Sequence, residues 1–123
     1  MPKRQQPVPR PLKRAEYELR HATREAEKGW TDLLATARNA AVEAWDFLTK
    51  TPLDRCDRCH PLKGDLATVT VQGVTLSRWQ YEVTRGGRIW YAVGGTVDKH
   101  TAGTVFLVRV TTGHPNATVK QFR

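Results

Sequence analysis

Two cysteines and a histidine lie close together in the run Cys56-Asp57-Arg58-Cys59-His60, and residues of these types bind metals and exchange electrons. The spacing formally matches a haem-attachment motif, but Met1 is the only methionine and is unsuited as an axial ligand. Zinc is a better fit, because two cysteines at this spacing supply half of a tetrahedral site. His60, His100 or His114 would then have to converge on them. A redox pair is a further alternative, and two unpaired, solvent-facing thiols are the favoured interpretation.

A second set of polar residues alternates with apolar ones between residues 78 and 93. This period of two predicts two strands joined by a turn at Arg85-Gly86-Gly87. A three-residue loop pairs Thr84 with Arg88 and Val83 with Ile89, whereas a two-residue loop would mix polar and apolar residues on both faces. The predicted apolar face contains Trp79, Tyr81, Val83, Ile89, Tyr91 and Val93. The predicted polar face contains Arg78, Gln80, Glu82, Arg88 and Trp90.

Cations, a carboxylate and an aromatic ring on one face suit the binding of phosphates. Arg88 offers a permanent charge with forked donors, which matches a phosphate group. Glu82 is a candidate general base, although an ion pair with Arg78 or Arg88 is an equal alternative. Lys63 and Trp90 are candidate contacts for a phosphate and for a nucleic-acid base. The N-terminal arm is an alternative partner for the Trp90 ring.

A histidine follows the last apolar run, which extends from Thr104 to Val110. Histidine is the side chain whose charge changes most readily near neutral pH, so His114 is a candidate proton donor. Thr118 and Lys120 follow at alternate spacing and are further candidate contacts for RNA. A histidine before a proline is also common in turns, so a purely structural role for His114 stays open.

The elements before these residues are predicted to be an arm and two helices. Prolines among basic residues at positions 1–11 predict a flexible basic arm. Apolar residues spaced by three or four predict helices over about 13–50, interrupted at Gly29, with Thr31 or Asp32 capping the second helix. The first helix depends on Ala15, Leu19, Ala22 and Ala26.

The elements that follow are predicted to form a sheet over about residues 65–121. Thr51-Pro52 ends the second helix, because the residue before a proline avoids the helical region. Leu66, Val69 and Val71 predict a first strand, with a turn at Gly73. The continuous apolar run before His114 predicts a central strand.

The bulk composition predicts a single domain over residues 12–123. The chain has 123 residues, of which 39% are hydrophobic, and carries 20 Lys and Arg against 12 Asp and Glu. Its net charge of +8 attracts polyanions such as nucleic acid or an acidic protein, although a merely solvated basic surface is an alternative. No apolar run approaches the roughly 18 residues of a membrane span, and the N-terminus lacks the apolar core of a secretory signal. We therefore expect a cytoplasmic protein without a membrane partner.

Three short segments resemble the RelE/ParE superfamily of bacterial toxin–antitoxin toxins. They are Leu62-Lys63-Gly64-Asp65-Leu66, the strand from Trp79 to Val83, and Arg88-Ile89-Trp90-Tyr91. The run from Val105 to Val110 followed by His114-Pro115 fits the last element of that family. The resemblance covers roughly residues 15 to 120 and implies a RelE-like α+β fold, with an N-terminal helical hairpin packed on a small twisted antiparallel sheet of three to four strands.

The resemblance also implies a function. RelE-like members cleave messenger RNA in the ribosomal A site by attack of a 2′-hydroxyl on the adjacent phosphate. Carried over to this chain, Arg88 stabilises the phosphate, Glu82 is the base and His114 the acid, without a cofactor or metal and with a cognate acidic antitoxin as partner. However, Gln80 and Glu82 stand where ribosome-dependent members often carry lysines. The alternatives are a ParE-like inhibitor of DNA gyrase and a zinc-stabilised nucleic-acid-binding module around Cys56 and Cys59.

Overall fold

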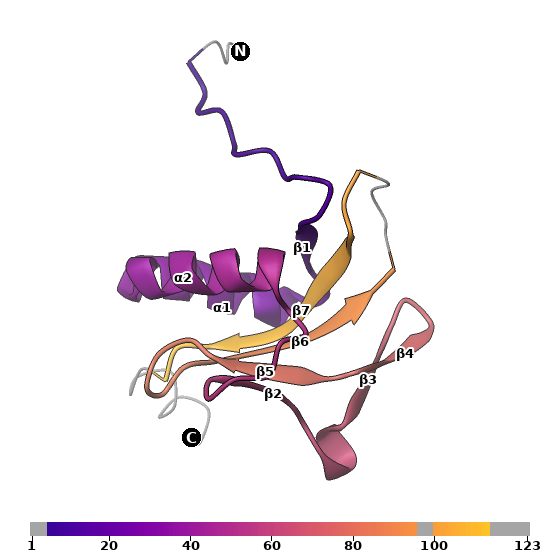
Figure 1. The fold of residues 1–123 in the computed structure, drawn as a ribbon. Helices are drawn as coiled ribbons and strands as arrows, with labels where there is room; N and C mark the ends of the chain where they lie inside the picture. The colour runs from indigo at the N-terminus through magenta and orange to yellow at the C-terminus, as the bar shows by residue number, and fades with distance from the viewer. Residues whose placement is uncertain (1–4, 96–99, 114–123) are drawn as a thin grey trace.

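The computed structural model describes residues 5–95 and 100–113. Two helices cover one face of a five-stranded sheet, and a separate two-stranded hairpin extends from the end of this sheet (Figure 1). In sheet order the strands are β1 (Tyr17–His21), β7 (Gly103–Thr111), β6 (Arg88–Gly94), β5 (Trp79–Glu82) and β2 (Cys59–Pro61). Strands β7, β6 and β5 are antiparallel, as predicted, and β2 adds a further antiparallel strand in a segment where the sequence predicted a loop. β1 adds a parallel edge to β7. The predicted α+β class is confirmed.

Strand β1 occupies a segment for which the sequence predicted a helix, and that prediction is wrong. Tyr17 and Leu19 pack against the core, while the Arg20 Nε atom donates to the Glu18 carboxylate at 2.9 Å. This alternation of apolar and charged residues is the period of a strand. Pairing with the long central β7 therefore outweighs the helical spacing of the alanines around it.

Helix α1 (Arg24–Thr36) begins directly after β1. Thr23 is its N-cap, because its hydroxyl accepts from the amide three residues later at 2.9 Å. The same hydroxyl donates to the carbonyl of Val108 in β7 at 2.8 Å and so attaches the helix to the sheet. The predicted caps Thr31 and Asp32 lie inside α1, so their assignment as caps is wrong.

Gly29 lies in the middle of α1 and does not interrupt it, contrary to the prediction. A Cβ at this position would lie 1.9 Å from the carbonyl oxygen of Val110, so only glycine allows the helix to approach β7 this closely. The break between the helices comes instead at Ala37, whose φ and ψ are −151° and 61°. Helix α2 (Arg38–Lys50) ends before Thr51-Pro52, as predicted.

A short 3₁₀ turn and a hairpin connect β2 to β5. The turn spans Gly64–Leu66, so the prediction that Leu66 begins a strand is wrong. Strands β3 (Thr68–Val71) and β4 (Val74–Ser77) form the hairpin, and its turn lies at Gln72 and Gly73, as predicted for Gly73. Both turn residues have positive φ, which glycine adopts without strain.

A polar contact is buried in the core where β2 and β6 meet the end of α2. The Tyr91 hydroxyl donates to the carbonyl oxygen of Pro52 at 2.6 Å and lies 2.9 Å from the Cys59 sulfur. Since the hydroxyl hydrogen is directed at Pro52, the Cys59 thiol is the donor to the Tyr91 oxygen. Burial raises the pKa of Tyr91, and the contact with Cys59 raises it further.

We expect Tyr91→Phe to lower the free energy of unfolding by about 1–3 kcal/mol, because the Pro52 carbonyl and the Cys59 thiol lose their partner inside the core. Urea denaturation measures the change. Tyr17→Phe is the matched control, since the structure gives the half-buried Tyr17 no hydrogen bond from its hydroxyl among the described residues. Equal losses in the two variants would show that the buried contact contributes nothing.

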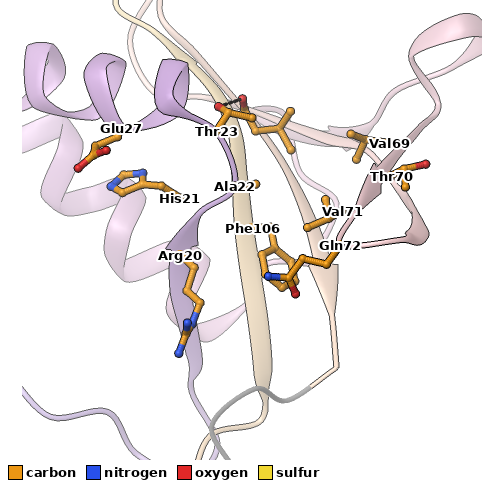
Figure 2. Close-up of a pocket in the computed structure, with 11 residues that line it drawn as sticks. Arg20, His21, Ala22, Thr23, Glu27, Val69, Thr70, Val71, Gln72 and Phe106 are labelled. Carbon is orange, nitrogen blue, oxygen red and sulfur yellow. Dashed lines mark hydrogen bonds between the residues drawn. The ribbon is translucent and has the colours of Figure 1, made fainter.

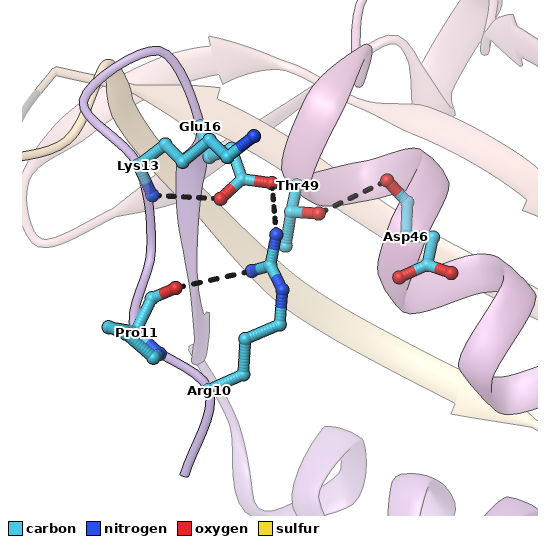
Figure 3. A network of polar contacts seen from close by, with 6 residues as sticks. All are labelled: Arg10, Pro11, Lys13, Glu16, Asp46 and Thr49. Atoms are coloured by element: carbon cyan, nitrogen blue, oxygen red, sulfur yellow. Dashed lines mark hydrogen bonds and ion pairs between the residues drawn. The ribbon is translucent and has the colours of Figure 1, made fainter.

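A second polar network lies in the segment directly before β1 and reaches α2 (Figure 3). The guanidinium of Arg10 donates to the Glu16 carboxylate at 2.8 Å, and the Lys13 amide donates to the same carboxylate at 2.8 Å. Arg10 also lies over the ring of Trp45 in α2, 5.4 Å from its centroid. The hydrogen bond from Arg10, with that from the Lys13 amide, lowers the pKa of Glu16 to about 2.

This network predicts a pH dependence of stability. The folded pKa of Glu16, about 2, lies below the ordinary value of 4.5, so its contribution to stability is complete above pH 4.5 and is lost as the pH falls through 2. We therefore expect Glu16→Gln to melt at a lower temperature than the native chain at pH 7, with a difference that narrows between pH 4.5 and 2. Thermal melts of Glu43→Gln, an exposed carboxylate of α2, are the control. A difference in melting temperature that does not change with pH would contradict the lowered pKa of Glu16.

Candidate functional site

Strand pairing brings two rows of side chains together across the sheet. The first row crosses β2, β5, β6 and β7 and contains His60, Gln80, Trp90 and Arg109. The second row crosses β5, β6 and β7 and contains Glu82, Arg88 and Thr111. Directly opposed residues of antiparallel strands share a face, and the intervening Tyr81 and Ile89 are buried under the helices. We call the two rows, together with Arg78, the polar face.

The predicted division of the hairpin into a polar and an apolar face is confirmed, but the predicted pairing is wrong. Arg88 lies opposite Glu82 and not Thr84. The Val83 amide donates to the carbonyl of Gly87 at 3.2 Å, so the loop begins one residue earlier than predicted. The Thr84 hydroxyl accepts from the Gly87 amide at 2.8 Å and closes this loop. Because the pairing moves by two residues, each side chain keeps its face.

Trp90 is the centre of the first row. Its indole Nε1 donates to the Gln80 side-chain oxygen at 2.8 Å. The guanidinium groups of Arg78 and Arg109 lie 5.4 and 5.7 Å from the centroid of its ring, within the range of cation–π attraction. Arg78 Nε is buried and has no hydrogen-bond partner among the described residues. Two positive charges are therefore held at one aromatic ring.

Arg109 was missed by the sequence analysis. It stands inside the apolar run that predicts the last strand, where a single charged residue is unexpected. That interruption is the signal, since a charge in a central strand must point away from the core. The N-terminal arm was an alternative partner for the Trp90 ring. Arg10, a residue of this arm, lies over the Trp45 ring instead.

Arg88, the predicted phosphate-binding residue, has a structural role as well. Its Nη1 donates to the carbonyl oxygens of Thr84, Arg85 and Gly87 at 3.2, 3.0 and 2.9 Å. The guanidinium thus fixes the loop between β5 and β6. Its Nε and Nη2 atoms make no hydrogen bond to the described parts of the chain, so they keep donors for an anion on the polar face.

The backbone of Glu82 is fixed by two hydrogen bonds, and its side chain belongs to the second row of the polar face. Its amide donates to the carbonyl of Arg58 at 2.7 Å, and the Arg58 Nε donates back to the Glu82 carbonyl at 2.9 Å. Within residues 5–95 and 100–113, no Arg or Lys nitrogen lies within 4.0 Å of its carboxylate. The alternative of an ion pair with Arg78 or Arg88 is therefore wrong, and the carboxylate keeps its acceptor capacity.

A histidine that sequence analysis did not assign to this surface completes the first row. His60 is exposed on β2 opposite Gln80, and its Nδ1 lies 3.1 Å from the carbonyl oxygen of Pro61. A carbonyl only accepts, so Nδ1 carries the proton of this bond and Nε2 is left for a ligand. The sequence signal is weak, because a three-residue strand beside a proline shows no period.

The remaining predicted contacts lie elsewhere. Lys63 is exposed at the start of the 3₁₀ turn, next to β2 but not in either row. The predicted acid His114 and the predicted contacts Thr118 and Lys120 lie outside the described residues. The structure therefore brings together Arg78, Glu82, Arg88 and Trp90 of the predicted site.

The cysteine pair gives a mixed outcome. Cys56 is exposed, as predicted, but Cys59 is buried, so the prediction of two solvent-facing thiols is wrong for Cys59. The described part of the chain contains no group of three or more His, Cys, Asp or Glu side chains placed to hold a metal. The zinc alternative therefore finds no third ligand there.

A pocket of about 500 Å³ lies apart from the polar face, between the β3–β4 hairpin and the junction of β1 with α1 (Figure 2). Arg20 and His21 line it from β1, Val69 and Thr70 from the hairpin, and Phe106 from β7. None of the polar-face residues lines it. The polar face is thus separate from this pocket.

Two helices cover one face of the mixed sheet, and the polar face lies on the other side. A solved structure of a YoeB/ParE toxin from Agrobacterium tumefaciens matches with a TM-score of 0.56 over 79% of this chain and 99% of that chain. The two sequences are 18% identical, so the match establishes the fold. No family model and no curated protein sequence matches the chain. No helix in the described segments is long and apolar enough to cross a membrane.

Proposed function

We propose that the chain is a RelE-like toxin endoribonuclease that cleaves messenger RNA, with ribosome-bound and free messenger RNA as the two candidate forms of the substrate. The observation that carries the proposal is the polar face, on which a carboxylate, a histidine and three arginines share one side of the sheet with an indole ring. Cleavage through the 2′-hydroxyl requires a base, an acid and cations on one surface. The likeness in fold to a protein named as a toxin supports the same assignment.

The proposed reaction uses each of these groups once. The Glu82 carboxylate takes the proton of the 2′-hydroxyl, and the oxygen attacks the adjacent phosphorus. His60, protonated on both ring nitrogens for this step, gives the Nε2 proton to the departing 5′-oxygen, while Nδ1–H stays bonded to the Pro61 carbonyl. Residues one row apart on neighbouring strands lie about 7–8 Å apart, which leaves room for a phosphate between His60 and Glu82. Arg88 stabilises the additional negative charge, and Arg78 and Arg109 bind a neighbouring phosphate beside Trp90.

The experiment is cleavage of messenger RNA by the purified chain, measured without ribosomes in the presence of EDTA and with ribosomes in a buffer that contains Mg²⁺. We expect discrete products whose formation Glu82→Gln and Arg88→Ala abolish. Glu82→Gln preserves size and the backbone bonds of Glu82, so its result does not depend on the loop that Arg88 fixes. Arg85→Ala, an exposed cation of the same loop, is the control. Cleavage by Glu82→Gln at the native rate would refute the proposed base.

His114 stays a second candidate for the acid, with Thr118, Lys120 and Lys63 as further RNA contacts. The same assay separates the two histidines. If His60 is the acid, His114→Ala retains most of the activity, whereas the reverse result assigns the role to His114. Growth arrest on expression provides the readout in cells.

A cognate acidic antitoxin is the proposed protein partner. The chain has a net charge of +8, and the polar face contributes three arginines against one glutamate. An acidic segment laid across this face would block access of RNA. Co-expression with a small acidic protein encoded by a neighbouring reading frame is expected to relieve growth arrest, and Arg78→Glu with Arg109→Glu is expected to weaken the complex.

One observation favours the alternative of a ParE-like inhibitor of DNA gyrase. Nη1 of Arg88 is fully engaged by three carbonyls, as in a residue whose role is to shape a loop. Trapped gyrase–DNA complexes together with intact RNA would establish this alternative and refute the nuclease.

A further inference from the structure

The two cysteines face each other across a tight turn. The Cys56 amide donates to the carbonyl of Cys59 at 3.0 Å, and the Cys59 amide donates to the carbonyl of Cys56 at 3.1 Å. Residues that exchange both bonds have Cα atoms about 5.5 Å apart and side chains on the same face. A disulfide requires about 4.4–6.8 Å between Cα atoms, so the backbone already lies within the range for a bond.

The two thiols differ in their surroundings. Cys56 is exposed, whereas Cys59 has no exposed surface and its sulfur lies 2.9 Å from the Tyr91 hydroxyl. Burial raises the pKa of Cys59. The exposed thiol is therefore the one that meets a dissolved oxidant, and the buried thiol is placed to react second.

We propose that Cys56 and Cys59 form a reversible intramolecular disulfide when the protein meets a peroxide. The Cys56 thiol loses its proton, its sulfur attacks one peroxide oxygen and the O–O bond breaks. The departing hydroxide takes up a proton, so sulfenic acid and water are formed. Cys59 then gives up its proton, its sulfur attacks the Cys56 sulfur, and a second water leaves. Peroxide takes the two electrons, and a dithiol reductant returns them.

The disulfide removes the Cys59 thiol from its contact with Tyr91 and constrains the turn that leads into β2. Arg58 lies in this turn and donates to the Glu82 and Val83 carbonyls at 2.9 Å each. His60 follows directly. Oxidation thus acts at the edge of the sheet from which the polar face begins. An effect on RNA cleavage rests on the proposed function, whereas formation of the disulfide does not.

The test is to treat the full chain with hydrogen peroxide, alkylate the remaining thiols, and measure intact mass and disulfide-linked peptides. We expect a monomer whose mass is lower by two hydrogens and whose digest contains a peptide with Cys56 linked to Cys59. After reduction with dithiothreitol, both thiols are expected to be alkylated. Cys56→Ser is expected to leave Cys59 alkylated once the chain is unfolded, whereas Cys59→Ser is expected to stop at sulfenic acid on Cys56.

Three results would overturn the proposal: two free thiols after peroxide, a sulfinic acid on Cys56 beside a free Cys59, or a disulfide between two chains. Cys56→Ser changes an exposed side chain, so its result stands even if Cys59→Ser does not fold. Because mass is the readout, an absence of RNA cleavage would refute the nuclease and leave this result intact.

Discussion

His60→Ala is expected to slow cleavage of an ordinary RNA substrate by about 10²- to 10⁴-fold, the usual contribution of a positioned acid. His60 lies on β2 opposite Gln80, and its Nδ1 bond to the Pro61 carbonyl orients the ring. The carboxylate and the arginines of the polar face remain in the variant, so substrate binding is expected to change little. Single-turnover rates on a short RNA, with binding measured separately, give the two quantities.

A substrate with sulfur in place of the bridging 5′-oxygen makes the test specific for an acid. A thiolate departs without protonation, so His60→Ala is expected to cleave this substrate nearly as fast as the native chain does. His21→Ala, an exposed histidine at the end of β1, is the control and is expected to cleave both substrates normally. An equal loss on both substrates would assign His60 to binding or to the fold and would leave the protonation step to His114.

The division of the hairpin into faces could be predicted from the sequence, whereas the position of its loop could not. Alternation fixes which side of the sheet a residue occupies, and it is unaffected by a shift of two residues. The loop depends on the Thr84 hydroxyl, which accepts from the Gly87 amide. It also depends on Arg88, whose guanidinium binds the loop carbonyls. Such side-chain contacts leave no period in a sequence.

The two edge strands of the sheet, β1 and β2, could not be predicted from the sequence. β1 was read as a helix because its apolar residues fit both periods, and only pairing with β7 decides between them. β2 has three residues, too few for any period, and it carries His60. The part of the candidate site on β5 and β6 was therefore predicted from the sequence. His60 and Arg109 were missed, because only the pairing of their strands with β5 and β6 places them in the site.

Gly29→Ala is expected to lower the free energy of unfolding by about 2 kcal/mol or more, although alanine is the better helix former by about 1 kcal/mol. The added Cβ would lie 1.9 Å from the Val110 carbonyl oxygen and 2.8 Å from its carbon. The neighbour is backbone in the central strand and cannot rotate away. Relief requires α1 to move off β7, which opens the core around Leu33 and Ala26.

Urea denaturation measures this loss as a lower midpoint with an unchanged slope. Gly95→Ala is the matched control, because a Cβ there meets no atom within 4 Å, and its effect is expected to stay within about 0.5 kcal/mol. A Gly29→Ala variant that gained stability would mean that helix propensity outweighs the contact with Val110. The close approach of α1 to β7 would then not be what requires glycine at this position.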